Sequence, residues 1–565
     1  MYATKKQGLI RSSIILMAAI LVGKVAGLVF KIFLANILGG TGMGYFSSAY
    51  AVFTPLYALC AASLTPAVAQ LVSENDARGE LARVKGVKTA ALRIFLVPSI
   101  LCSTLPMLFA GFITRRFIGN EGAKLAVIAI LPCVFLGTVT AIYRGYYEGL
   151  RNMTPTALSQ ILESIVRVAS GIGLAYFAQR RALYQFVNGG NVFGVHCVSM
   201  NDMSDVSLPY IAAAAVLGVT ASEVSSFLFM LLRHKLGSDG IPKNVRPNSA
   251  EVSEEKKRLL KLIIPISAAG IVSSLAGTVD LYTIILCIKT SLSKFPELYT
   301  EKYADIIASG VSLKELPNYL YGSFTGLAMT VFGLAPSLCS VLGRSALPNI
   351  SEAWARCDYP RVGREIRRVL TVTLYISIPA GFGLAVMSHD ILGLLFSSRV
   401  EEVAISAQPL AIMALGTAFI TAGGAAYAML QAVGRADLPI KINLLGAFVK
   451  LALNSVLVPL PNMGLSGAAT ASLVSGAVMC LWAVTALYHI TGTKPRFGFS
   501  VFCPVFGGVI SSAGALWAKT AFSGYLSGAL SIAFSVTFAV MSYIISILLL
   551  DISTKNRVKA EILGK

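Results

Sequence analysis

The chain has 565 residues, of which 55% are hydrophobic and only 13% charged, and its mean hydropathy is +0.73. Soluble proteins carry charge on about 25% of their residues, so this composition excludes a soluble multidomain enzyme and indicates a polytopic membrane protein. The net charge of +20 does not require a nucleic acid partner, because basic residues collect on cytoplasmic loops that face anionic lipid.

Apolar segments long enough to cross a bilayer as helices, about 20 residues each, recur from end to end. The first of them follows Lys5 and Lys6, but it is long and lacks a convincing cleavage site, so we expect an uncleaved first span rather than a signal peptide. The sequence predicts an all-α membrane protein with fourteen transmembrane helices. These spans cover residues 11–36, 44–71, 90–113, 125–143, 155–177, 207–232, 260–288, 320–343, 368–388, 404–431, 438–460, 464–489, 499–518 and 527–550.

The distribution of basic residues orients this map. With the N-terminus inside, 32 of the 47 Lys and Arg residues lie in the inner segments or at the span ends that adjoin them, 11 lie in the outer loops, and four lie deep within spans. A threefold bias over an even number of spans predicts that both termini are cytoplasmic. Two outer loops, residues 178–206 and 289–319, are longer than the rest and are expected to carry short elements.

Two segments of the first half recur about 280 residues later. Leu64–Gln70 is echoed by Leu347–Glu352, and the elbow Tyr147–Pro155 is echoed by Leu430–Pro439. Parallel halves are a transporter layout with the substrate site between them, so we expect two six-helix lobes and two extra C-terminal helices. The expected divisions are an N-lobe (1–232), a cytoplasmic linker (233–259), a C-lobe (260–490), and the last two spans with a basic tail (491–565).

The first elbow leads into a helix that carries charges inside an apolar span. Thr154 is the expected N-cap and Pro155 suits the first turn. Glu163 and Arg167 then share a face at a spacing of four residues. Charges inside a membrane are expensive and face a protein interior or a wet cavity. The pair is therefore either a structural ion pair or a gate and ion-coupled switch.

Five other charged residues stand deep within spans. Glu223 and Asp280 are lone acids, and Asp280 lies deep enough to need a partner such as Lys24 or a cation. Lys24 and Lys31 lie seven residues apart on one face of the first span. Either lysine could extend to the membrane interface, although Lys24 is too near mid-membrane to do so easily.

Lysines in a central cavity would suit an anion such as a diphosphate. Lys450 shares a face of the eleventh span with Asn454, at the place in the second half that matches Glu163 and Arg167, and is a third candidate. These three lysines are the candidate substrate-binding cations, and Glu163, Arg167, Glu223 and Asp280 are the candidate gating or ion-pair residues.

Other signals are weak. The nine cysteines form no CxxC pair and mostly lie in apolar segments, where they act as small buried hydrophobes. Four histidines without an HExxH pattern give no metal site. Gly39–Gly44 lacks the lysine and serine of a phosphate-binding loop and is expected to form a tight outer turn. No grouping of a nucleophile with a base stands out, so we do not expect an enzyme.

Three stretches resemble a known family. The elbow Gly145–Arg167 is similar to the corresponding part of stage V sporulation protein B and its polysaccharide-biosynthesis relatives. Lys31–Tyr45 resembles that family's first loop and second span, and Gly464–Ser472 resembles the start of its twelfth span. The similarity extends over nearly the whole chain.

The resemblance implies the fold of the multidrug/oligosaccharidyl-lipid/polysaccharide (MOP) exporter superfamily, in which two six-helix lobes operate by alternating access. In its MurJ-type flippases a cationic cavity takes the diphosphate-sugar head of lipid II, and the two extra helices form a groove for the polyprenyl tail. The MurJ type carries arginines in spans one and eight. This chain has lysines in span one and no charge in span eight, so its head-group recognition is expected to differ.

The leading hypothesis is therefore a flippase of the bacterial cytoplasmic membrane that moves an undecaprenyl-diphosphate-linked saccharide, lipid II or a related cell-wall or polysaccharide precursor, to the outer leaflet. Its expected partners are that lipid, membrane lipids and cell-wall synthesis proteins. No cofactor is expected beyond a coupling ion, either Na⁺ or H⁺, or the membrane potential. A cation-coupled drug or metabolite antiporter of the MATE type is the alternative. A scaffold for cell-wall or spore-cortex synthesis that transports nothing is the third hypothesis.

Overall fold

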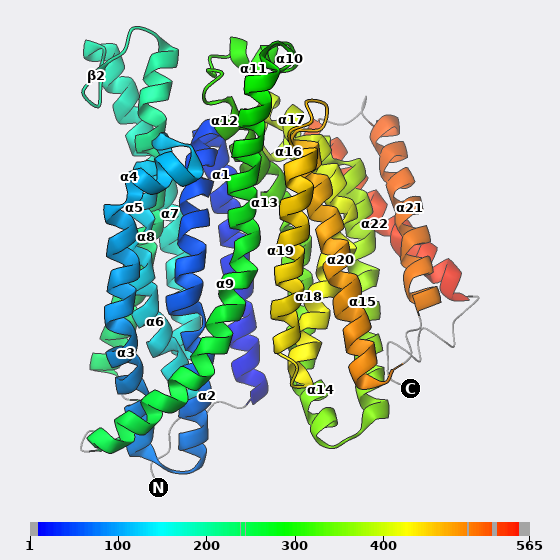
Figure 1. The fold of residues 1–565 in the computed structure, drawn as a ribbon. Coiled ribbons are helices and arrows are strands. Elements are labelled where there is room, and N and C mark those ends of the chain that lie inside the picture. Colours follow the sequence, from blue (N-terminus) through cyan, green and yellow to red (C-terminus); the bar gives the residue numbers. More distant parts are fainter. Residues whose placement is uncertain (1–8, 238, 243–244, 494–496, 523–527, 553–565) are drawn as a thin grey trace. The chain divides into compact units, whose positions relative to one another are not determined.

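The computed structural model describes residues 9–237, 239–242, 245–493, 497–522 and 528–552 (Figure 1). The predicted basic ends, with Lys5 and Lys6 at one and the tail after residue 552 at the other, lie outside these ranges. Apart from one two-stranded hairpin, the secondary structure of the described residues is helical. The chain divides into two compact units, one of Met1–Tyr282 with Gly310–Gly322 and the other of Thr283–Ser309 with Ser323–Lys565.

Eleven stretches of the described chain are long and apolar enough to cross a membrane, and twelve if the bent pair α17 and α18 counts as one span. One stretch, Ala18–Ala77, has 60 residues, far more than a single crossing of about 20 residues needs. It contains a break at Gly39, between the first and second predicted spans. The count of fourteen spans and the predicted domain divisions stay predictions.

The first unit is a helical bundle that includes the first part of α9 (Ser249–Lys294) and most of α12 (Leu316–Ser323). Its core is aliphatic and aromatic, with Leu64, Val68 and Tyr146 fully buried. Its other elements are α1 (Leu9–Tyr57), η1 (Ala58–Ala62), α2 (Leu64–Ala77), α3 (Leu81–Leu108), α4 (Ala110–Phe112), η2 (Ile113–Ile118), η3 (Glu121–Ala123), α5 (Lys124–Ile130), α6 (Pro132–Gly149), α7 (Thr154–Gly189), β1 (Asn191–Val192), β2 (Val195–His196) and α8 (Met200–Leu236).

The second unit has its own aliphatic core, in which Ile366, Met429 and Leu487 are fully buried. The predicted pair of extra helices packs within this unit: the α21–α22 pair lies against α15, where Tyr543 Oη donates a 2.7 Å hydrogen bond to the Tyr375 carbonyl. The elements are α10 (Pro296–Lys302), α11 (Ala304–Ala308), η4 (Phe324–Ala328), α13 (Met329–Phe332), α14 (Leu334–Ala355), α15 (Tyr359–Val386), α16 (Ser388–Leu395), α17 (Val400–Leu415), α18 (Thr417–Ala432), α19 (Asp437–Leu457), α20 (Leu465–Thr491), α21 (Phe497–Phe522) and α22 (Gly528–Ile552).

The predicted long outer loops are largely ordered into elements. Residues 178–206 continue α7, form the β1–β2 hairpin and begin α8, while residues 289–319 contain the end of α9 and the short helices α10 and α11. The expected tight turn at Gly39–Gly44 involves fewer residues than predicted. Within α1 only Gly39 has non-helical backbone angles, with φ 62° and ψ −172°. Glycine has no Cβ and adopts this left-handed conformation without strain.

The two elbows of the predicted repeat that follow α6 and α18 form the same pattern of backbone hydrogen bonds. After α6, Arg151 N–H donates to Glu148 and Asn152 N–H to Tyr147; after α18, Gly434 N–H donates to Gln431 and Arg435 N–H to Leu430. The turn residues Arg151 and Gly434 both have positive φ, 57° and 82°.

The elbows after α2 and α14 repeat the pattern, with positive φ at Gly79 and Cys357. This is the helix-ending turn in which a left-handed residue satisfies the last free carbonyls. The local agreement supports the predicted repeat, which over six helices per half stays a prediction.

Most cysteines behave as predicted. Six of the nine are buried and two are partly buried; only Cys357, in the elbow after α14, is exposed.

Candidate functional site

The elbow between α6 and α7 positions the main polar cluster of the first unit. The helix α7 begins at Thr154, one residue before the predicted start, so the predicted N-cap is wrong: Met153 occupies that place, and no side chain caps the helix. Pro155 stands in the first turn as expected. Arg144, one turn before the end of α6, points back into the bundle and not toward a loop, with its side chain 11% exposed.

Glu163 is the centre of a polar cluster that joins α6, α7 and α8. Its Oε2 lies 2.9 Å from Arg144 Nη2, and its Oε1 pairs with Arg167 one turn further along α7. The predicted Glu163–Arg167 pair is thus present. Arg144 also donates to Ser159 Oγ at 2.9 Å and to Ser226 Oγ at 2.8 Å. Buried charges are stable only when paired and hydrogen-bonded in this way.

Arg144 is the residue that sequence reasoning missed. It lies close to the end of an apolar run, where the sequence predicts an inner-loop charge. Its spacing from Tyr147 and the elbow does not indicate that it faces inward. Only the packing of α6 against α8, on the side that carries Ser226, reveals its role.

Glu223, predicted as a lone acid, lies in α8 beside this cluster and is 6% exposed. Its Oε1 has no hydrogen-bond partner among the described residues. A Cβ placed on Gly137 would lie 3.1 Å from that oxygen and 2.5 Å from Tyr57 Cε2. The carboxyl therefore sits in a tight pocket formed by α6 and the aromatic face of α1.

Lys24 and Lys31 are both exposed, in the middle of α1. Their neighbours touch the helix that carries Glu163 and Arg167: a Cβ on Gly23 would lie 3.2 Å from Ser164 Oγ, and Phe30 packs on Gly171. The face of α1 that carries both lysines therefore lies beside α7.

The two remaining predicted residues are buried and lie elsewhere. Asp280 is 2% exposed in the part of α9 that belongs to the first unit. Lys450 is 8% exposed in α19 of the second unit, one turn before Asn454, which donates a 2.8 Å hydrogen bond to Thr283 Oγ1. The structure therefore groups Glu163, Arg167 and Glu223, and it places Lys24 and Lys31 in α1, which packs against α7.

A second polar contact joins α12 to α1 within the first unit. Asn318 Nδ2 donates to the Thr41 carbonyl at 3.0 Å, and Tyr45 Oη donates to Glu315 Oε2 at 3.2 Å. Burial raises the pKa of the Glu315 carboxyl, which lies outside the membrane-spanning segments. The backbones meet so closely that a Cβ on Gly322 would overlap the carbonyl of Gly40.

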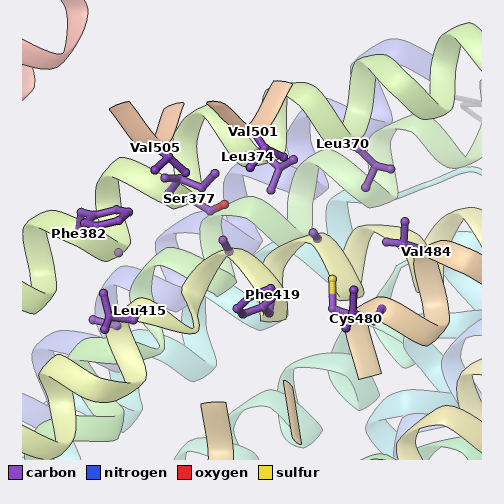
Figure 2. A pocket seen from close by; sticks show the side chains of 16 residues that line it. Leu370, Leu374, Ser377, Phe382, Leu415, Phe419, Cys480, Val484, Val501 and Val505 are labelled. Carbon is purple, nitrogen blue, oxygen red and sulfur yellow. The ribbon is translucent and has the colours of Figure 1, made fainter. Parts of the chain in front are cut away.

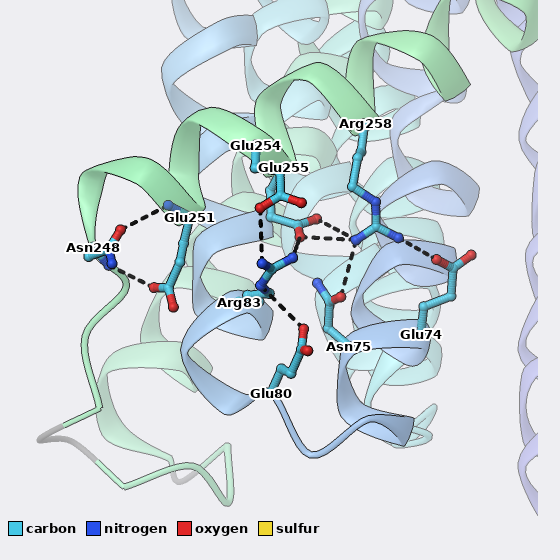
Figure 3. A network of polar contacts seen from close by, with 9 residues as sticks. All are labelled: Glu74, Asn75, Glu80, Arg83, Asn248, Glu251, Glu254, Glu255 and Arg258. Carbon is cyan, nitrogen blue, oxygen red and sulfur yellow. Dashed lines mark hydrogen bonds and ion pairs between the residues drawn. The ribbon is translucent and has the colours of Figure 1, made fainter.

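The start of α9 is held to α2 and α3 by an ion-pair network (Figure 3). Glu255 is fully buried; its Oε1 lies 3.0 Å from Arg258 Nη1 and 3.6 Å from Arg83 Nη1. Arg258 also reaches Glu74 at 2.6 Å and the Asn75 side-chain carbonyl at 3.2 Å. We interpret this network as structural, because its charges are mutually satisfied.

An apolar pocket of about 350 Å³ lies within the second unit (Figure 2). Helices α15, α17, α18, α20 and α21 form its wall, and among its lining residues only Ser377 and Cys480 are not aliphatic, aromatic or glycine. Such a pocket suits a hydrocarbon chain. No group of His, Cys, Asp or Glu in the described part of the chain could hold a metal ion.

Two family models match the sequence, "Polysaccharide biosynthesis protein" over residues 9–195 and "Lipid II flippase MurJ" over residues 118–549. The second match covers most of the chain. The chain belongs to the MurJ family. This confirms the resemblance of its elbow and loop motifs, and with the apolar helices it establishes a multi-pass membrane protein.

Two relatives match this chain over most of their length. Stage V sporulation protein B of Bacillus subtilis (strain 168) is 25% identical over 516 residues, covering 90% of this chain and 89% of the relative. Lipid II flippase MurJ of the same strain is 20% identical over 462 residues, covering 80% and 78%.

Solved structures confirm the predicted fold class. Lipid II flippase MurJ in an inward closed conformation matches with a TM-score of 0.65 at 14% identity, over 96% of this chain and 100% of that one. A MATE family transporter of the MOP superfamily in an inward-facing conformation matches with a TM-score of 0.60 at 14% identity, over 84% and 96%. These relatives are flippases and transporters, in agreement with the prediction that the chain is not an enzyme.

Proposed function

We propose that this MurJ-family protein flips an undecaprenyl-diphosphate-linked saccharide from the inner to the outer leaflet of the bacterial cytoplasmic membrane by alternating access, with both termini cytoplasmic. Two exposed lysines, Lys24 and Lys31, lie on one face of the first span and are the main support for this proposal. In this proposal the two ammonium groups there neutralise the negative charge of a diphosphate. Lys450 is the corresponding candidate in the second unit.

The apolar pocket of the second unit supports a lipid cargo. A polyprenyl tail is a methyl-branched hydrocarbon, and each methylene removed from water contributes about 0.8 kcal/mol. The pocket between α15 and α21 offers aliphatic and aromatic walls to part of such a tail (Figure 2). In this proposal the pocket holds part of the hydrocarbon chain.

The polar contacts of the first unit supply the elements that would rearrange. Glu163, Arg167 and Asp280 are proposed to make contacts that break and reform between the inward-open and outward-open states. The driving force would be an ion gradient or the membrane potential.

The decisive experiment measures the leaflet distribution of lipid-linked precursors after depletion of this protein in its own cells. We expect one precursor to accumulate on the inner leaflet, which identifies the cargo and establishes the flippase. An unchanged distribution in cells without a redundant relative would contradict the proposal.

The MATE-type antiporter is the second candidate, since a MATE transporter shares the fold at a TM-score of 0.60. It predicts an apolar or acidic cavity for an organic cation, and the two exposed lysines of α1 oppose this. Drug-stimulated proton or sodium movement in proteoliposomes, together with no lipid movement, would favour the antiporter.

A further inference from the structure

Glu223 differs from every other member of the polar cluster in the first unit. It is 6% exposed, and its Oε1 has no partner in the described structure. Both ion pairs of the cluster go to Glu163. A buried carboxylate oxygen without a hydrogen-bond partner is costly, and binding a proton or a cation stabilises it.

The surroundings of Glu223 come from four helices. Its titratable and charged neighbours are Tyr50 and Tyr57 from α1, Cys133 and Arg144 from α6, and Glu163 and Arg167 from α7. The helix α5 presents a backbone carbonyl at Ala129, which accepts from Thr220 of α8. The cluster thus holds two guanidinium groups against two carboxyl groups.

The two arginines are shared unequally between these carboxyls. Glu163 accepts from both, while Arg167 Nε and Glu223 Oε1 are left as an unsatisfied donor and an unsatisfied acceptor. Ser226, which accepts from Arg144, lies three residues after Glu223 and hence on the same face of α8. A small rotation of Arg144 would therefore move its guanidinium from Ser226 toward Glu223.

We propose that Glu223 is a proton-binding site, and that the proton decides how the two arginines are shared between Glu163 and Glu223. With the carboxyl neutral, both arginines stay on Glu163, as in this structure. When its O–H bond breaks, the proton passes to water that reaches the partly exposed Arg167 side chain, and the new carboxylate draws one guanidinium from Glu163.

This exchange would alter the contacts between α6, α7 and α8. A coupling of that change to transport rests on the proposed function, whereas proton binding does not.

The first test measures protonation directly, without cargo. Infrared difference spectra of the full-length protein in liposomes are recorded between acidic and alkaline buffer. We expect a band of a protonated carboxylic acid that disappears on deprotonation, that is absent in Glu223→Gln, and that is shifted but present in Glu223→Asp. Glu255→Gln is the matched control, because Glu255 is equally buried but held by two arginines, and it should keep the wild-type band.

Identical spectra for wild type and Glu223→Gln would overturn the proposal. Retention of the wild-type elution volume and thermal midpoint by Glu223→Gln shows that the loss is not misfolding, and Glu223→Asp supplies the answer if the glutamine variant does not fold.

The second test separates the coupling from the proposed function. Proteoliposomes that contain a fluorescent polyprenyl-diphosphate lipid are assayed with and without a pH gradient. We expect the gradient to accelerate lipid movement in wild type and Glu223→Asp, and to have no effect in Glu223→Gln. Gradient stimulation that survives in Glu223→Gln would refute the coupling. Absence of any lipid movement in wild type, with the infrared band still dependent on Glu223, would refute the flippase and leave the proton site standing.

Discussion

Removing Arg144 tests whether the cluster around Glu163 stabilises the first unit. Arg144→Ala deletes an ion pair at 2.9 Å and hydrogen bonds to Ser159 and Ser226. Loss of one partner of a buried pair costs about 3–5 kcal/mol because the other charge is left unpaired. Since Arg167 still holds Glu163, we expect a value near the lower end, about 3 kcal/mol.

The measurement is reversible unfolding in mixed micelles, followed by intrinsic fluorescence, with a double-mutant cycle. If the pair is energetically coupled, Arg144→Ala combined with Glu163→Gln will be less destabilising than the sum of the single changes, by about 1–3 kcal/mol. If the two residues are not coupled, the changes in unfolding free energy of the two single variants will add in the double variant.

Arg115→Ala is the control for burial. Its ion pair with Glu121 has the same 2.9 Å separation, but the two side chains are 74% and 67% exposed. Exposed pairs contribute at most about 1 kcal/mol. The reasoning is refuted if Arg144→Ala destabilises the protein no more than Arg115→Ala does.

Three further predictions concern the site and the packing. Lys24→Ala should abolish lipid movement in proteoliposomes without loss of folded protein. The control Lys441→Ala changes a side chain that is 63% exposed and should leave the rate unchanged. Full activity of Lys24→Ala would contradict the assignment of a diphosphate ligand. Ala422→Trp fills the apolar pocket and should slow transport of long-chain polyprenyl lipids more than that of short-chain analogues, and an equal effect on both would argue against tail binding. Gly322→Ala forces a methyl group onto the backbone of α1 and should lower the free energy of unfolding by about 1–3 kcal/mol. The measurement is the midpoint of unfolding, which should decrease. An unchanged midpoint would show that the α12–α1 contact is loosely packed.

The sequence predicted those features that depend on composition and spacing along one helix. Apolar runs located the helices, and the four-residue spacing of Glu163 and Arg167 predicted their pair, because neighbours on one helix face are fixed by its geometry. The all-α membrane fold followed from the same apolar runs and its superfamily from motifs, and the solved structures confirm the fold class.

Features that several helices build together could not be predicted. Arg144 looked like a loop charge until the packing of α6 turned it inward. The apolar pocket is formed by residues from five helices, each of which looks like an ordinary lipid-facing or core residue in sequence. The N-cap prediction at Thr154 failed because the left-handed Arg151 turn sets where α7 begins, and Met153 is then the capping position.

The two elbows with matching backbone hydrogen bonds identify the positions of the second unit that correspond to the cluster of the first. Counted from the first residue of each helix, Glu163 in α7 corresponds to Gly446 in α19, and Arg167 corresponds to Lys450. Counted back from the left-handed turn residue, Arg144 corresponds to Tyr427.

In the second unit a glycine, Gly446, thus occupies the position of the Glu163 carboxylate. Met479 packs against this glycine so closely that a Cβ on Gly446 would overlap the methionine sulfur. The same backbone elbow is therefore stable with apolar packing and no glutamate at this position. Because buried ion pairs are often replaceable by apolar groups at no loss of stability, folding of this elbow does not require the two arginines and two carboxyls of the first unit, and we propose that they act in the transport cycle of the proposed function.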